Sequence, residues 1–386
     1  MNHYLKRFAK NMDYPLLITY ILLCLFGLVM IYSASMVWAV ERYGFEPDHF
    51  YRKQILNLTL AVPAFLIGAI IPYKHYKRKG MMISMLVVMF ALLFAVHIIG
   101  YDAGGAKSWI HLGFANLQPS EVAKIIIVLY FAAVFANKYD KGMIDNINYS
   151  IGPPLAVLVL ALFSIMLETD IGTSIIIFFT AISVMAASGI KFRTFAKMSG
   201  VLFAIMAAIS PFLYLFHDKI LTERRLGRLE AFLNPFEHAQ DLGFQVVNGY
   251  IAIGSGGLTG LGLGQSIQKL GYLPEPQTDF IMAIIAEELG LLGVAIVIGG
   301  LGFIVLRAMY IALASKDPQG RMIAAGFGSM IGFQTFVNLG GLTGLIPLTG
   351  VPLPFISYGG TSVILLSFAV GILMNVSMFV RYENSK

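Results

Sequence analysis

The chain has 386 residues, of which 58% are hydrophobic and only 12% are charged. Soluble domains carry roughly 25% charged residues, so this composition excludes a soluble globular protein. The mean hydropathy of +0.77 agrees with that exclusion. The net charge of +6 does not indicate nucleic-acid binding, because the basic residues are spread over short loops instead of one face. The single cysteine, Cys24, excludes an intrachain disulfide.

Long, unbroken apolar stretches indicate membrane-spanning helices, since a span needs about 20 apolar residues whereas barrel strands alternate over roughly 10. The predicted fold class is therefore all-α, a polytopic integral membrane protein of about ten transmembrane helices that forms a single domain over residues 1–386. In chain order we expect the spans at 14–36, 54–72, 80–100, 118–136, 150–168, 170–190, 195–216, 279–306, 322–344 and 355–380.

Lysine and arginine are concentrated in alternate loops, and this asymmetry orients the helices. With the N-terminus inside, the short outer loops hold only Arg42, Arg52, Lys53 and Lys107. We therefore expect a plasma-membrane protein in which residues 1–13 and the tail 381–386 are both cytoplasmic.

The connection over residues 217–278 is the one long loop, which predicts an extracellular segment between the seventh and eighth spans. Long loops are often functional. Its first half contains Arg224, Arg225 and Arg228, whose forked guanidinium groups suit phosphate geometry. Binding to anionic lipid head groups is an equally good explanation. Its second half is rich in glycine.

Two common kinds of site are missing from the sequence. The glycine-rich stretch from Gly260 to Ser266 lacks the lysine that precedes the hydroxyl residue in a phosphate loop, and it faces outward. We therefore expect no nucleotide. The scattered histidines show no spacing that would hold zinc.

Asp279 is the acid that we single out, at the point where the outer loop enters the eighth span. An acid at a helix start can simply cap the helix. Alternatively, it can act as a general base at a pocket mouth, where partial burial would raise its pKa. Pro274 and Pro276 stiffen the approach to it.

Glu287 and Glu288 follow on the same predicted helix. At about 100° per residue, Glu287 lies about 80° from Asp279 and Glu288 about 180° away, so at most one shares its face. Buried carboxylates in a membrane are costly. We expect them to face a cavity or a cation from another helix, and a structural ion pair is the simpler alternative.

The fourth span opens with Gln118-Pro-Ser-Glu121 and continues to Lys124. Glu121 and Lys124 share one helix face, so they can neutralise each other for membrane insertion. Lys124 can also offer a fixed positive charge to a phosphate group. Just upstream, Trp109 is placed at the outer interface, where aromatic belts form. Asp170, at the start of the sixth span, is interpreted as a helix cap.

The stretch from Pro347 to Ser362 breaks the helical pattern at the outer end of the last span. Irregular backbone at membrane depth is tolerated only where it is buried in protein or lines a cavity. Ser357 and Tyr358 in this stretch are therefore candidate binding residues.

Several ordered motifs carry a resemblance to a known family. Asn338 followed by Gly344-Leu-Ile-Pro and by Leu353-Pro-Phe-Ile-Ser-Tyr-Gly-Gly360 is similar to the signature of the SEDS proteins FtsW, RodA and SpoVE. The same family is indicated by Gln118-Pro-Ser-Glu121, Ala252-Ile-Gly-Ser-Gly-Gly257, Gly262-Leu-Gly264, Tyr272-Leu-Pro-Glu275 and Thr278-Asp-Phe280. Tyr32-Ser-Ala-Ser35 favours the FtsW branch over RodA.

This resemblance implies a ten-helix fold and a peptidoglycan glycosyltransferase that polymerises lipid II into β-1,4-linked strands. It maps the family's essential acid to Asp279. Gln277 stands where many relatives have histidine, which puts in doubt any role for an imidazole there. Lys124, Glu121, Trp109, Arg224, Arg228, Ser357 and Tyr358 are the candidate substrate-binding residues, and a divalent cation, Mg²⁺ or Mn²⁺, is a possible cofactor.

The resemblance also implies a class B penicillin-binding transpeptidase as partner, within the membrane proteins of the divisome or the elongasome. Two other functions stay open. One is a lipid II flippase, and the other is a non-enzymatic scaffold that recruits the transpeptidase. A role in division, elongation or sporulation is not resolved by sequence.

Overall fold

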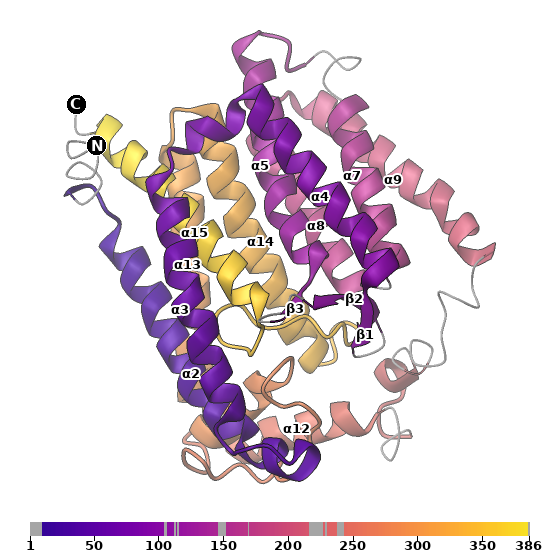
Figure 1. Cartoon of the computed structure of the whole chain (residues 1–386), viewed down its shortest axis with the longest axis vertical. Helices are drawn as coiled ribbons and strands as arrows, with labels where there is room; N and C mark the ends of the chain where they lie inside the picture. Colours follow the sequence, from indigo (N-terminus) through magenta and orange to yellow (C-terminus); the bar gives the residue numbers. More distant parts are fainter. Residues whose placement is uncertain are drawn as a thin grey trace.

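The computed structural model describes residues 10–103, 106–111, 113, 116–145, 152–168, 170–215, 227, 230–237 and 243–384. Each of the ten predicted spans coincides with a helix (Figure 1). The helices are α2 (Tyr14–Tyr43), α3 (His49–Ile70), α4 (Lys79–Ile99), α5 (Pro119–Asp140), α7 (Gly152–Leu167), α8 (Ile171–Ala187), α9 (Phe192–Leu215), α13 (Ile281–Ala314), α14 (Pro318–Leu342) and α15 (Thr361–Asn384).

Among the described residues, seven of these helices are long and apolar enough to cross a membrane. Helices α7 and α8 are apolar but shorter, at 16 and 17 residues. The predicted fold of a polytopic helical membrane protein is confirmed. Helix α15 begins at Thr361 and not at 355, because the proline- and glycine-rich stretch before it does not continue the helix.

The end of the bundle where α4 ends and α5 begins carries structure that the all-α prediction did not contain. A short antiparallel sheet of order β1-β2-β3 joins β1 (Tyr101–Ala103), β2 (Ala106–His111) and β3 (Asn116–Leu117). Helix α12 (Phe244–Gly256) lies at the same end, inside the predicted outer loop (Figure 1). A 3₁₀ turn, η1 (Tyr73–Lys77), connects α3 to α4.

Helix α5 is the centre of the bundle. Its apolar window is 94% buried within the protein, whereas that of α4 is only 17% buried. The mean hydropathy runs the other way, 1.8 for α5 and 2.7 for α4. A central helix can keep polar residues because protein surrounds them, but a peripheral one must present apolar side chains to lipid.

The beginning of α2 and the end of α15 meet at one end of the bundle. Asp13 is fully buried, and its carboxylate accepts hydrogen bonds from Arg307 Nε at 2.9 Å and Ser377 Oγ at 2.9 Å. Arg381 also pairs with it at 2.9 Å. The two ends of the described chain therefore lie on the same side, as an even number of spans requires.

Helix α13 is interrupted at Gly290, which has φ 62° and ψ −154°. The break leaves backbone groups without helical partners, and residues 257–262 supply them. Leu261 N donates to Glu287 O at 2.9 Å, Gly262 N donates to Glu288 O at 2.9 Å, and Leu291 N donates to Gly257 O at 3.1 Å. This part of the predicted outer loop is thus built into the bundle.

Replacing Gly290 with alanine is expected to lower the midpoint of thermal unfolding. Its φ and ψ lie in a region that costs other residues about 1–3 kcal/mol. The added Cβ would also lie 2.4 Å from the backbone nitrogen of Gly260. Gly299→Ala in the same helix is the matched control, since its Cβ would meet nothing within 4 Å. Equal unfolding midpoints for the two purified variants would contradict the prediction.

Candidate functional site

Asp279 is half-buried just before α13 begins. Its backbone is held by α14, because Asn338 Nδ2 donates to Asp279 O at 2.9 Å and to Val351 O at 2.8 Å. Thr278 Oγ1 donates to Asp279 Oδ1 at 3.2 Å. The other carboxylate oxygen faces Gly350, where an added Cβ would lie 3.9 Å away. Asp279 is therefore placed by its neighbour Thr278 and by two segments that are distant in sequence, α14 and the stretch around Gly350.

The irregular stretch before α15 packs against Asp279. Tyr358 N donates to Gln277 O at 2.9 Å, and Gln334 Nε2 of α14 donates to Pro352 O at 3.0 Å. Phe355 adopts a positive φ of 64°, which is uncommon for a bulky residue. Such strain persists only where the surroundings fix it, and it occurs often at functional sites.

Lys124 lies in a buried polar cluster on α5. Its Nζ is 2.8 Å from Glu121 Oε1 and donates to Gln334 Oε1 at 2.8 Å. Ser362 Oγ donates to Glu121 Oε2 at 3.0 Å. Because Gln334 also binds Pro352, this cluster is joined to the segment that packs on Asp279. The predicted pairing of Glu121 with Lys124 is thus observed. It does not decide whether Lys124 also offers its charge to a phosphate group.

Asp170 caps α8 as predicted, since its Oδ1 accepts from Thr173 N at 3.1 Å. It also does something that the sequence did not indicate. Its Oδ2 accepts from Gln118 Nε2 at 2.8 Å and Ser120 Oγ at 3.0 Å. It therefore ties the start of α8 to the start of α5. Gly172 completes this junction, because a Cβ there would lie 2.6 Å from Val351.

Glu168 is a site residue that sequence reasoning missed. It is the first residue beyond α7 and is only 1% exposed. Neither carboxyl oxygen has a hydrogen-bond partner among the described residues. Burial, and then the nearby charge of Asp170, raises the pKa of this carboxyl to about 9. The only sequence signal is an acid at the end of an apolar run.

The remaining candidates are less directly placed. Trp109 is half-buried in β2, opposite Tyr101. Ser357 is buried, and its Oγ accepts from Leu353 N at 2.8 Å, which is a structural contact. The Tyr358 ring packs edge-on against Phe50 with centroids 5.3 Å apart. Two further candidates, Arg224 and Arg228, lie outside the described residues.

Glu288 pairs with a cation from a loop and not from another helix, so the simpler alternative, a structural ion pair, is what the structure shows. Lys269 Nζ lies 2.7 Å from Glu288 Oε1. Glu287 is hydrogen-bonded by the turn 266–268. Within the described part of the chain, no three His, Cys, Asp or Glu side chains gather into a group that could hold a metal ion.

The arrangement combines a half-buried carboxylate just before α13 with a buried lysine and several polar side chains that are joined to the adjoining loop. A carboxylate in this position can accept a proton, and an ammonium group can stabilise an anion. These are the parts of a membrane-embedded site for a reaction in which negative charge develops.

The fold and this site define a polytopic membrane protein with its chemistry at one end of the bundle. A family model described as "Cell cycle protein" and named for FtsW, RodA and SpoVE matches residues 14–382. The chain therefore belongs to the FtsW/RodA/SpoVE family, and the predicted resemblance is confirmed.

Curated relatives cover nearly the whole chain. "Probable peptidoglycan glycosyltransferase FtsW" of Bacillus subtilis is 45% identical over 99% of this chain and 94% of its own length. "Stage V sporulation protein E" of the same organism is 36% identical over 96% of this chain and 98% of its own.

Two solved structures share the fold. A chain in "Structural coordination of polymerization and crosslinking by a peptidoglycan synthase complex" matches with a TM-score of 0.74 at 23% identity, covering 96% of this chain and 99% of that one. The rod shape determining protein RodA of Thermus thermophilus matches with a TM-score of 0.64 at 24% identity, covering 95% and 96%.

Glu168 should make stability depend on pH. Its pKa is about 9 in the folded protein and 4.5 in an unperturbed chain, so the folded state holds a proton that the unfolded state releases between these values. Its stabilising contribution is complete below pH 4.5 and is lost as the pH rises towards 9, by at most about 1.4 kcal/mol per pH unit.

The midpoint of thermal unfolding of the wild type should therefore fall between pH 5 and pH 8.5. In Glu168→Gln this fall should be smaller. Glu41→Gln, at an exposed carboxyl, is the control and should keep the wild-type slope. Parallel pH curves for wild type and Glu168→Gln would show that this carboxyl is not protonated in the folded protein.

Proposed function

We propose that this protein is a peptidoglycan glycosyltransferase that polymerises lipid II into β-1,4-linked glycan strands at the outer face of the plasma membrane. The observation that carries the proposal is the position of Asp279, fixed by Asn338 beside an irregular loop and above a buried lysine. Relatives at 45% and 37% identity bear the name of a peptidoglycan glycosyltransferase.

In the proposed reaction, the 4-hydroxyl of the acceptor GlcNAc gives its proton to Asp279 as its oxygen attacks the donor anomeric carbon. The bond between that carbon and the pyrophosphate oxygen breaks, and its electron pair leaves with undecaprenyl pyrophosphate. The configuration at the carbon inverts. A single carboxylate suits this chemistry, because pyrophosphate leaves readily without an acid.

Lys124 is the proposed cation for the leaving pyrophosphate. Its ammonium group has three N–H donors, and Glu121 and Gln334 account for two of them. The loop arginines Arg224 and Arg228 are proposed to assist. Mg²⁺ commonly binds through one or two carboxylates together with substrate phosphates. A divalent cation would therefore fit the proposed reaction, and it stays a prediction.

The cellular setting follows the same reasoning. We propose one domain over residues 1–386, with cytoplasmic ends and an outer segment over 217–278. The partner would be a class B penicillin-binding transpeptidase, since one protein of the same fold comes from a complex that coordinates polymerisation and crosslinking. The 45% relative named FtsW, against 36% for the sporulation protein, favours a role in cell division.

Asp279→Asn is expected to reduce polymerisation by about 10²- to 10⁴-fold, the range that a positioned general base contributes. The measurement is glycan chain formation from lipid II by the purified protein together with its transpeptidase. The control is Asp140→Asn, which should polymerise normally. Its carboxyl is exposed at the last residue of α5, whereas Lys124 lies near the first. Undiminished glycan synthesis by Asp279→Asn would refute the base assignment.

Membrane orientation can be tested with single cysteines in a Cys24→Ala background. A cysteine at exposed Leu345, between α14 and α15, should react with an impermeant maleimide in intact cells. A cysteine at exposed Lys316, between α13 and α14, should react only after permeabilisation. The opposite labelling pattern would place Asp279 on the cytoplasmic side and remove the site from its substrate.

A further inference from the structure

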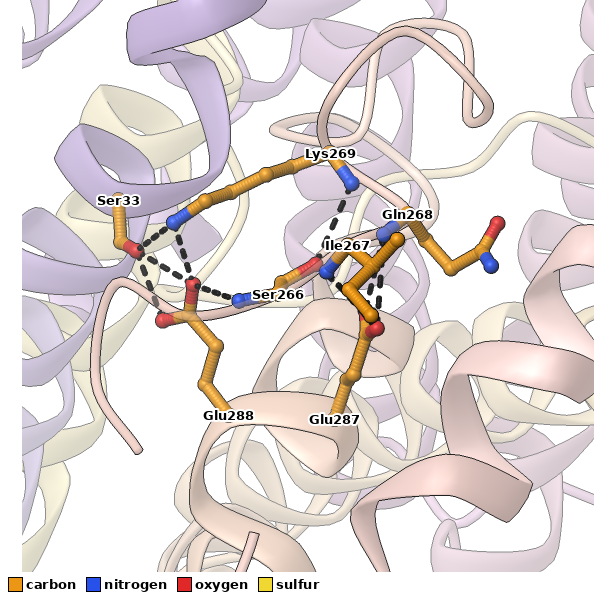
Figure 2. A network of polar contacts seen from close by, with 7 residues as sticks. All are labelled: Ser33, Ser266, Ile267, Gln268, Lys269, Glu287 and Glu288. Atoms are coloured by element: carbon orange, nitrogen blue, oxygen red, sulfur yellow. Dashed lines mark hydrogen bonds and ion pairs between the residues drawn. The ribbon is translucent and has the colours of Figure 1, made fainter. Parts of the chain in front are cut away.

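A second buried polar network lies outside the contacts of Asp279. Figure 2 shows Glu287 and Glu288 of α13 reaching the turn 266–269, with Ser33 of α2 beside them. We call residues 257–270 the inserted loop, because its first part also fills the backbone break at Gly290. Neither the general base nor the phosphate contacts proposed above use this network.

Glu288 is the centre of the network. It is fully buried, and its Oε1 pairs with Lys269 Nζ, itself 1% exposed, at 2.7 Å. Ser33 Oγ lies 2.7 Å from both carboxylate oxygens, and Lys269 Nζ donates to Ser33 Oγ at 3.1 Å. These contacts join α2, α13 and the inserted loop at one point (Figure 2).

Glu287 holds the same loop by its turn. Its carboxylate accepts from Ser266 Oγ at 2.5 Å and from the backbone nitrogen of Ile267 at 2.9 Å, and more weakly from that of Gln268 at 3.4 Å. The network thus contains two buried carboxylates and one ammonium group. Buried charges are costly unless they are paired and hydrogen-bonded. Glu288 and Lys269 meet both conditions, and Glu287 is hydrogen-bonded by the turn of the inserted loop.

Asp279 lies between two arms that this network joins. One arm is the helical segment 281–289, which ends beside the break and carries both glutamates. The other is the chain 270–278, which runs from Lys269 back to Asp279. Opening the Lys269–Glu288 pair would remove the ion pair that joins the two arms and links them to Ser33 of α2. The arms would then be joined by the turn contacts of Glu287 and by the backbone bonds of residues 261 and 262, and the position of Asp279 would be less firmly fixed.

We propose that the Lys269–Glu288 ion pair is a clasp that positions Asp279, so that Lys269, Glu288 and Ser33 are positioning residues for glycosyl transfer. This inference rests on the proposed function. It also gives a role to the Tyr32-Ser-Ala-Ser35 motif, whose Ser33 hydroxyl binds the clasp.

The first test is Lys269→Met, which keeps much of the side-chain volume and removes the charge. It should lower kcat for lipid II polymerisation at least tenfold and change KM less than threefold, because the substrate contacts around Lys124 are intact. Hydrogen–deuterium exchange of peptides covering 257–270 should rise, while exchange in α14 should not. Lys316→Met, at an exposed lysine, is the matched control and should leave both measurements unchanged.

The second test is rescue. Removing one partner strands a buried charge, whereas replacing both with apolar residues is often tolerated. Lys269→Met combined with Glu288→Met should therefore regain most of the exchange protection and at least a third of the wild-type kcat. Ser33→Ala removes the hydroxyl contacts with Glu288 and Lys269 and keeps the ion pair, so it should lower kcat about threefold. It provides the comparison if Lys269→Met does not fold.

The proposal would be overturned if hydrogen–deuterium exchange of residues 257–270 were unchanged in Lys269→Met. It would also be overturned if that exchange rose while kcat stayed the same. A double variant as impaired as Lys269→Met would also overturn it, because the charge balance would then not be the cause. Full activity of Asp279→Asn would instead refute the proposed function and with it the positioning of a base, and the exchange data would still decide whether the pair holds the loop.

Discussion

The architecture around the first half of α13 depends on how the backbone groups freed at Gly290 are satisfied. A break in a membrane helix is tolerated only where other protein groups replace the lost hydrogen bonds. Here the inserted loop supplies them, and its close approach requires glycine, since a Cβ on Gly256 or Gly260 would lie 1.8 Å and 2.2 Å from carbonyl oxygens of α13. The carboxylates of Glu287 and Glu288 precede the break and bind the same loop. Backbone and side-chain contacts thus reinforce one another, and the loop becomes part of the bundle.

Buried charges in the described residues follow one rule, which is that each belongs to a hydrogen-bonded group. Asp13 pairs with Arg307 and Arg381 where α2 begins, Glu121 pairs with Lys124 in the first two turns of α5, and Glu288 pairs with Lys269 beside the break in α13. Glu168 is the exception, and its raised pKa is the physical consequence, because a carboxyl without a partner avoids the cost of burial by keeping its proton. A buried acid that keeps its proton beside the helix cap Asp170 distinguishes this corner of the site from the paired clusters.

The sequence predicted the positions of the ten helices because lipid imposes long apolar runs. It did not distinguish the buried helix α5 from the peripheral α4, since both are apolar and only their neighbours differ. The break at Gly290 was not predicted either, because an isolated glycine in an apolar helix is usually tolerated. The helical-wheel argument placed Glu287 and Glu288 relative to Asp279, yet it could not find Lys269, whose approach depends on the fold of the loop. Asp170 was recognised as a cap from its position, whereas its bonds to Gln118 and Ser120 join different helices.

The two buried lysines of the described residues, Lys124 and Lys269, have different surroundings, and the difference argues for different roles. Lys269 shares Glu288 with Ser33, and the neighbouring Glu287 is satisfied by the turn itself, so these contacts are made among α2, α13 and the inserted loop. Lys124 is bound to Glu121 and to Gln334, and Gln334 in turn holds the irregular segment that packs against Asp279. If a ligand displaced that segment, the Gln334 side chain would transmit the displacement to Lys124. Lys269 is suited to hold the base in place, and Lys124 is suited to respond to what binds beside it.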